Sequence, residues 1–430
     1  MNRPTTQPQP RLIVPDLARG LALAGIAMAN AVQAWLLNGY DEAGGPGSTL
    51  GGVREGNVAD QVAAVFSALF VHVRGLPMFS TLLGFGIGLI AASLYRKGYP
   101  AKNARRILLR RYGILALFGL AHMFLLFMGD IMAVYGVTGM VVALLFTCQT
   151  KTLRIIAYLS LIASALFGVI GAVGLYFFEA AALPVEMMTL TTDITSVGDY
   201  FRTNATDGLF MLVSVPFAVL ELGGLVLIGY IWAREGYLVN VDQHRRILWT
   251  WVGVGTAIVL LIGLPWGLSG IGVLDPRLEL SLSLLNSSLG LFTGPAILAG
   301  LALITNSIQQ GMNAQAEATG TSTAPAWAYP FVALGKRSMS GYLAQSILFI
   351  LLVMPFTLGW GLEASVSGKL LVGLAVWIIT LILAVILEHT GTPGPFEQVH
   401  RRLSYGPTKR LEPYSPAALP TSPQLEQQSQ

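Results

Sequence analysis

The first apolar segment of the chain carries three side chains that need a partner or water inside hydrocarbon. Asp16, Arg19 and Asn30 stand within the otherwise hydrophobic residues 14–30. A charge at the bilayer centre costs roughly 2.5–3.5 kcal/mol on insertion scales, and such residues usually face a bundle interior or a watery cavity. On a helix, Asp16 and Arg19 lie three residues apart and can pair. Asn30 follows eleven residues later, about 16 Å along the same side. The spacing predicts one helix face with polar groups at two depths.

Two histidines and one carboxylate can supply acid–base chemistry in the outer half of the apolar segments. His122 and Asp130 end one segment, and His72 with Arg74 precedes another. Histidine can act as acid or base near neutral pH, and Asp130 can orient a ring. The alternative is a packing network of satisfied hydrogen bonds. The polar groups that can line one outward-opening cavity are Asn30, Gln33, His72, Arg74, His122 and Asp130.

A further carboxylate, Glu221, falls near the middle of an apolar segment. It is either a proton or cation site, as intramembrane carboxylates often are, or a protonated and hydrogen-bonded group. Several other chemistries are excluded by spacing. Residues 335–338 read Gly-Lys-Arg-Ser but lack the upstream glycine of a phosphate-binding loop. The sequence has no His or Cys pair at metal-ligand spacing and no nucleophile elbow, so we expect no metal.

Composition identifies the elements that must position these groups. The chain has 430 residues, of which 54% are hydrophobic and 11% charged, against roughly 25% charged residues in soluble proteins. Apolar runs of about 20 residues predict an all-α, polytopic membrane protein. The net charge of +4 belongs to cytoplasmic loops in such a protein, so we expect the bilayer as a partner and no nucleic acid. A single cysteine, Cys148, excludes an internal disulfide.

The apolar pattern predicts ten transmembrane helices. Residues 58–72 are apolar but short, which favours an interfacial or re-entrant helix. The basic loop 96–111 contains no acid, whereas loops 38–57 and 179–207 are mainly acidic. The positive-inside rule then places both termini in the cytoplasm. The predicted spans are 17–37, 76–95, 109–128, 131–148, 155–178, 209–233, 247–268, 284–306, 330–356 and 366–388.

The domain organisation follows from composition along the chain. Residues 11–306 form a bundle of about eight spans, and residues 330–406 contribute two more. Between them, residues 307–329 are rich in Gln, Ala, Thr, Gly and Ser and are expected to be a linker. Residues 1–10 and 407–430 are polar and rich in proline, so we expect both to be disordered.

Motifs at both ends resemble those of the YeiB-like bacterial membrane proteins, which are named for a C-terminal domain of unknown function, number 418. The resemblance covers about residues 11–406. It implies an inner-membrane protein, for which family annotation has loosely suggested transport. The motifs that carry it are Asp16-x-x-Arg19-Gly20 with Asn30, and residues 77–88, 335–346 and 394–406.

The first helix also resembles the wider group of transmembrane acyltransferases, which includes glycan O-acetylating enzymes and glucosamine N-acetyltransferases. Arg19 matches the arginine of the O-acetylating branch, but Asn30 stands where that branch has a histidine. The glucosamine branch has an asparagine there and places its catalytic histidine in the following outer loop. Residues 38–57 contain no histidine, so His72 and His122 are the nearest substitutes.

The leading hypothesis is acyl transfer from cytosolic acyl-CoA to an extracytoplasmic small-molecule or glycan acceptor. Arg19, with Lys336 or Arg105, would hold the donor phosphates. His122 or His72 would deprotonate the acceptor, and Asp130 would orient the base. Further candidate binding residues are Asp16, Asn30, Gln33, Arg74, Glu221 and Gln345.

Two other interpretations stay open. In a transporter or exporter of a small molecule, the same groups would line the path and Glu221 would couple protons. A structural or sensory membrane protein would need no turnover. Acyl-CoA would be a co-substrate, and no permanently bound cofactor is expected. The oligomeric state is left open by the sequence.

Overall fold

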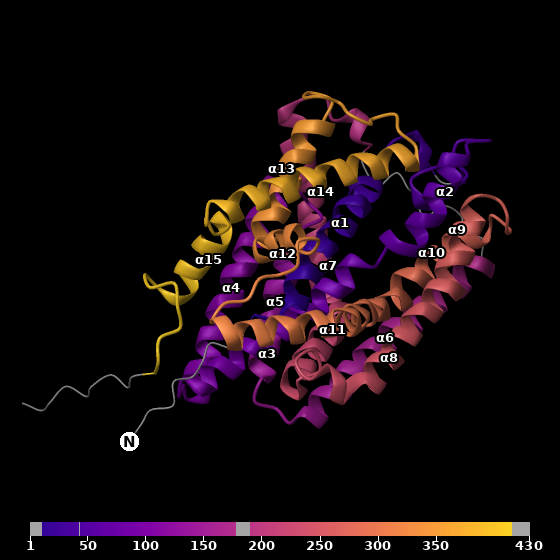
Figure 1. Ribbon diagram of the computed structural model, residues 1–430. Coiled ribbons are helices and arrows are strands. Elements are labelled where there is room, and N and C mark those ends of the chain that lie inside the picture. The colour runs from indigo at the N-terminus through magenta and orange to yellow at the C-terminus, as the bar shows by residue number, and fades with distance from the viewer. Residues whose placement is uncertain (1–10, 43, 178–189, 415–430) are drawn as a thin grey trace, which may run out of the picture.

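The computed structural model describes residues 11–42, 44–177 and 190–414, and all regular structure within them is helical (Figure 1). Within the described residues, eight helices are long and apolar enough to cross a membrane, and two shorter apolar helices, Met132–Leu145 and Ser338–Val353, accompany them. The chain is therefore an all-α membrane protein, as predicted. Each predicted span overlaps one of these helices, and the span 330–356 also includes a separate short helix, Tyr329–Lys336. Their full count as spans stays a prediction. The eight long runs are Ile13–Trp35, Val58–Arg96, Ala101–Leu125, Thr150–Phe177, Val197–Glu235, Val241–Gly270, Leu278–Thr319 and Val366–His389.

Several of these runs contain turns of π- or 3-10 helix, so they divide into shorter α-helices. The α-helices are α1 (Ile13–Asn30), α2 (Val58–Phe66), α3 (Gly75–Arg96), α4 (Ala101–Leu125), α5 (Met132–Leu145), α6 (Thr150–Phe177), α7 (Val197–Glu235), α8 (Val241–Ile258), α9 (Leu264–Gly270), α10 (Leu278–Leu289), α11 (Thr293–Thr319), α12 (Tyr329–Lys336), α13 (Ser338–Val353), α14 (Val366–His389) and α15 (Pro395–Tyr405).

Helix α1 lies inside the bundle and contacts α3, α11, α12, α13 and α14. It crosses α12 with backbone against backbone. A methyl group on Gly20 would lie 2.2 Å from the Phe331 carbonyl oxygen, and one on Gly335 would lie 1.8 Å from that of Asp16. Small residues allow such close helix approach in membrane proteins. These two glycines therefore join the first and last parts of the chain.

The α4–α5 hairpin holds two of the predicted polar residues, His122 and Asp130. Its helices also approach through small residues, since a methyl group on Gly119 would lie 1.9 Å from the Ala133 nitrogen. Helix α4 ends at Leu125, and the short turn before α5 contains Asp130. In Figure 1, α15 lies beside α4 at one edge of the bundle, and these two helices are in contact. The hairpin thus links the outer turn to the C-terminal helix.

The segments between the predicted spans differ in part from expectation. Residues 58–71 form α2 and a π-helical turn that continue into α3 only after a break at His72–Arg74, where Val73 has φ of +55°. The predicted linker 307–329 begins as helix, because α11 continues through good helix formers to Thr319 and is capped by Gly320 in the left-handed conformation.

The C-terminal segment 407–430, expected to be disordered, is packed over its described part. The Tyr414 amide donates to the Lys97 carbonyl, and the Tyr99 hydroxyl donates to the Glu412 carbonyl. The tail therefore crosses to the α3–α4 turn, which supplies the backbone partners that its composition did not reveal. Residues 1–10 and 415–430, also predicted to be disordered, lie outside the described residues.

The α3–α7 crossing gives a test of the fold. A methyl group on Gly229 would lie 1.8 Å from the Thr81 carbonyl oxygen, whereas one on Gly223 of the same helix meets nothing within 4 Å. We expect Gly229→Ala to destabilise the protein by about 1–3 kcal/mol through overpacking. Gly223→Ala should leave the stability nearly unchanged. Thermal unfolding of both variants in detergent, followed by size exclusion, measures the difference, and equal unfolding temperatures would contradict this packing.

Candidate functional site

The structure joins His122 and Asp130 to a third side chain, Ser346 of α13. The His122 Nδ1 lies 2.8 Å from Asp130 Oδ1, and its Nε2 lies 2.9 Å from Ser346 Oγ. All three residues are at most 5% exposed. We call these three residues the relay. The predicted pairing of Asp130 with a histidine is thus present in the geometry.

Local structure fixes each member of the relay. His122 stands in the last turn of α4, where its carbonyl accepts hydrogen bonds from the amides of Leu126 and Phe127. The second carboxylate oxygen of Asp130 accepts from the Ala133 amide at 2.7 Å, at the start of α5. That oxygen is therefore occupied, and the other is directed to the imidazole.

Helix α13 is fixed in the same way. Gln345, one of the predicted binding residues, donates through its side-chain amide to the Leu23 carbonyl of α1 at 3.2 Å. The Tyr342 ring, one turn before Ser346, lies 5.1 Å from the His122 ring. Gln345 thus helps to position Ser346, and its side-chain amide is already hydrogen-bonded to a backbone carbonyl.

The hydrogen-bond geometry suits one tautomer of the imidazole. An ionised carboxylate only accepts hydrogen bonds, so Asp130 in that form is a partner for a proton on Nδ1 of His122. The Nε2 lone pair then faces the Ser346 hydroxyl. This arrangement can accept a proton from a hydroxyl group, while the carboxylate stabilises the imidazolium that forms.

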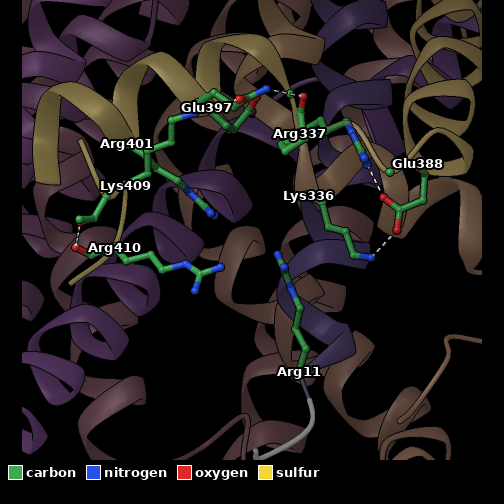
Figure 2. A pocket seen from close by; sticks show the side chains of 13 residues that line it. Arg11, Lys336, Arg337, Glu388, Glu397, Arg401, Lys409 and Arg410 are labelled. Carbon is green, nitrogen blue, oxygen red and sulfur yellow. Dashed lines mark hydrogen bonds and ion pairs between the residues drawn. The ribbon is translucent and has the colours of Figure 1, made fainter. Parts of the chain in front are cut away.

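A basic pocket of about 510 Å³ lies at the end of the bundle where α1 and α13 begin (Figure 2). Its cations come from the residues just before α1, the α12–α13 junction, α15 and the C-terminal tail. Ser346 lies nine residues after Arg337, about 13 Å along α13. The charged residues that line the basic pocket are Arg11, Lys336, Arg337, Glu388, Glu397, Arg401, Lys409 and Arg410.

The two carboxylates of the basic pocket already have partners. Glu388 pairs with Lys336 at 2.6 Å and with Arg337. Glu397 accepts from the amides of Met339 and Ser340 at the start of α13. Within the described residues, Arg401 and Arg410 have no carboxylate partner, and Figure 2 shows both on the same side of the pocket. The pocket therefore has uncompensated positive charge suited to an anion.

A second basic pocket of about 520 Å³ adjoins the first and shares Arg401, Lys409 and Arg410 with it. Lys97 and Arg111 also line it, with Glu412 as its carboxylate. Arg11, the first described residue, and residues 408–410 of the tail thus line the same pocket.

An apolar pocket of about 410 Å³ lies at the opposite end of α1 and α13. Trp35, Phe127, Tyr200 and Met354 are among its lining residues. The Phe127 ring also meets the His122 ring edge-on, with centroids 6.4 Å apart. The relay therefore lies between the two basic pockets, which we call the basic pocket pair, and the apolar pocket. Phe127 lines the apolar pocket and contacts the relay.

His72 and Arg74 form a separate cluster rather than joining the relay. The fully buried His72 ring lies 5.2 Å from Trp266, and neither of its nitrogens has a hydrogen-bond partner among the described residues. Arg74 donates to the carbonyls of residues 68, 69 and 73 and to Asn286 Oδ1. The six-residue cavity proposed from the sequence thus divides, because the break after α2 turns His72 and Arg74 toward α9 and α10.

The other predicted residues divide between the basic end and isolated positions. Arg19 pairs with Asp16 at 3.4 Å, which confirms the expected contact, and Arg11 also pairs with Asp16. Lys336 lines the basic pocket, whereas Arg105 donates to Thr147 at the surface. The remaining three stand apart: Asn30 and Glu221 are half-buried and Gln33 is exposed.

Sequence reasoning missed Ser346, Arg401 and Arg410. Ser346 follows Gln345 inside one of the recognised motifs, and Arg401 lies inside another. The motifs were therefore a signal, but a serine on an apolar helix has no pattern that connects it to a histidine 224 residues away. Only the packing of α13 against α4 gives it a role.

An all-helical membrane bundle with a buried acid–base relay and a basic pocket at one end defines the class of this protein. Residues 232–407 match the family described as "Protein of unknown function (DUF418)", which confirms, over these residues, the resemblance to the proteins named for this domain. The chain is also similar to "Uncharacterized protein YxaH" of Bacillus subtilis (strain 168). The two are 24% identical over 409 residues, which cover 92% of this chain and 94% of the relative.

Helix α15 lines both basic pockets, and we expect its packing on the bundle to depend on pH through His400. Burial, and next the charge of Arg111, lower the pKa of His400 from 6.5 to about 4. Its Nε2 donates to the Arg111 carbonyl at 3.0 Å, and this bond raises the pKa of His400 by less than burial and Arg111 lower it. The stabilisation is therefore fully present above pH 6.5 and is lost as the pH falls toward 4.

We expect hydrogen exchange in residues 395–405, corrected for intrinsic rates, to increase between about pH 7.5 and about pH 5. His400→Gln keeps a side-chain N–H donor but does not titrate, so this variant should lose the pH dependence. The same increase in the variant would show that another group controls the docking of α15.

Proposed function

We propose that this protein is an acyltransferase of the bacterial cytoplasmic membrane. It takes an acyl group from cytosolic acyl-CoA and transfers it to a small-molecule or glycan acceptor on the opposite side. The observation that carries the proposal is the relay of Asp130, His122 and Ser346, buried between a basic pocket pair and an apolar pocket at opposite ends of the bundle.

The basic pocket pair suits the phosphates of the donor. By the positive-inside rule, the end with the basic loops faces the cytosol, where acyl-CoA is made. Arg401 and Arg410 line both basic pockets and have no carboxylate partner among the described residues. Guanidinium groups bind phosphate through strong, charge-assisted and often bidentate hydrogen bonds. Arg11 and Lys336, already paired with carboxylates, add positive potential around the same site.

The relay suits the proton transfers of acyl transfer. His122 Nε2 is oriented as a base, and Asp130 holds the ring and its tautomer from the other side. A positioned general base of this kind contributes roughly 10²–10⁴-fold in rate. The low exposure of all three groups excludes bulk water, which limits hydrolysis of the donor.

The first test removes the base. We expect His122→Gln to lower acyl transfer by roughly 10²–10⁴-fold while the protein still binds coenzyme A. Surface glycans and lipids of cells that lack or express the protein are compared by mass spectrometry to find the acylated product. Ser281→Ala, which removes a buried polar group of α10 outside the relay, is the control and should keep activity. Unchanged acylation with His122→Gln would refute the proposal.

The second test separates donor binding from chemistry. Arg401→Gln with Arg410→Gln should weaken coenzyme A binding by roughly tenfold or more per lost contact, because each bond to a charged group contributes about 1.5–3 kcal/mol. Arg402→Gln on the same helix is exposed and lines neither basic pocket, so its affinity should stay unchanged. Calorimetry on the purified protein measures both. Equal loss with Arg402→Gln would indicate only a general charge effect.

Transport of a small molecule is the second candidate, and it is favoured by pockets at both ends and by Glu221 half-buried in α7. In that case Glu221→Gln would abolish uptake or efflux in vesicles, and no acyl product would depend on His122. Acylated product together with an active Glu221→Gln variant favours the enzyme.

A further inference from the structure

The relay contains a hydroxyl group that direct transfer between donor and acceptor does not require. We propose that Ser346 is a nucleophile that carries the acyl group as a covalent ester between the two half-reactions. This inference rests on the proposed acyl transfer and names the intermediate at the same site. It makes the protein a two-step enzyme in which donor and acceptor react one after the other.

The geometry of the relay is that of an activated nucleophile. Ser346 Oγ lies 2.9 Å from His122 Nε2, and Asp130 Oδ1 lies 2.8 Å from Nδ1. A serine hydroxyl is a weak nucleophile until an adjacent base takes its proton, and a third group that orients the base completes the arrangement. The Ala133 amide occupies the other oxygen of Asp130, so the carboxylate cannot turn away from the ring. Asp130 is thus a positioning residue.

The position of Ser346 along the bundle gives a reason for two steps. It lies about 13 Å along α13 from Arg337 at the basic pocket and about 12 Å from Met354 at the apolar pocket. Direct transfer needs the two reacting atoms of donor and acceptor about 3–3.5 Å apart at one moment. A serine between the pockets lets each substrate approach from its own end, so the two need never meet.

The first half-reaction balances without another reactant. Ser346 Oγ attacks the thioester carbonyl carbon while His122 Nε2 takes the hydroxyl proton. The C–S bond then breaks, the sulfur receives the proton from His122, and coenzyme A leaves as a thiol. The serine carries an ester. Nothing is oxidised or reduced.

The second half-reaction returns the relay to its starting state. An acceptor hydroxyl or amine gives its proton to His122 and attacks the ester carbonyl carbon. The bond to Ser346 Oγ breaks, and that oxygen takes the proton from His122. Burial of the serine, which is 3% exposed, protects the ester from water while the acceptor arrives.

The experiment looks for the ester on the purified full-length protein. Protein in nanodiscs is mixed with acetyl-CoA, octanoyl-CoA or palmitoyl-CoA without acceptor, quenched in acid and digested for mass spectrometry. We expect a burst of about one coenzyme A per chain and a mass increase of one acyl group on the peptide that contains Ser346. The burst rate should fall roughly 10²-fold or more with His122→Gln.

Three substitutions distinguish the nucleophile from a structural hydroxyl. Ser346→Ala should lose the label completely. Ser346→Cys should restore it as a thioester that neutral hydroxylamine cleaves, which a merely structural role would not produce. Ser281→Ala removes a buried polar group of α10 outside the relay and should label as the natural protein does.

Two results would overturn the inference, and they differ. If Ser346→Ala still transfers acyl groups in a His122-dependent way and no chain is labelled, transfer is direct and the proposed function survives without the intermediate. If the natural protein neither releases coenzyme A nor forms acylated product with any of the three donors, the proposed function fails together with the inference.

Discussion

The hydrogen bond between His122 and Asp130 is the interaction on which the rest of the site depends. A carboxylate held inside a membrane bundle is stable only when it is paired and hydrogen-bonded. Asp130 meets this requirement with His122 on one oxygen and the Ala133 amide on the other. The α4–α5 turn is thereby fixed, and the imidazole has one free nitrogen. Helix α13 must then present a hydroxyl group at that nitrogen, or leave it unsatisfied.

The same requirement explains how the basic end is built. Six cations line the first basic pocket, and its two carboxylates serve structural purposes. Glu388 pairs with both residues of the α12–α13 junction, and Glu397 accepts from the first amides of α13. These contacts hold α13 in the register that brings Ser346 to His122. The remaining positive charge comes from Arg401 of α15 and Arg410 of the tail. Helix α15 thus holds the start of α13 through Glu397 and also contributes positive charge to the pocket.

The sequence predicted the parts of the structure that depend on local patterns. Apolar length and loop charge were enough for the helical class and for a helix at each predicted span, and the spacing of Asp16 and Arg19 was enough for their pair. The sequence also predicted that Asp130 orients one of two histidines, and the structure pairs it with His122, which stands in the same short hairpin. The separation of His72 was not predictable, since it depends on a break with φ of +55° at Val73. Ser346 and Arg401 were missed because long-range packing alone brings them to the site.

The residues that match the family contain only part of the candidate site. The matched residues 232–407 contain Ser346, Arg401 and Glu397 but neither His122 nor Asp130. His122 and Asp130 come from the α4–α5 hairpin, whereas Ser346 and Arg401 come from the C-terminal part. Helix α1 contacts the C-terminal part through Gly20 against α12 and through the Leu23 carbonyl, which accepts from Gln345, and the Leu23 side chain shares a hydrophobic cluster with Met132 of α5. Part of the first-helix motif is therefore explained by assembly: Gly20 of α1 and Gly335 of α12 allow these two helices to approach closely, and the relay lies on other helices.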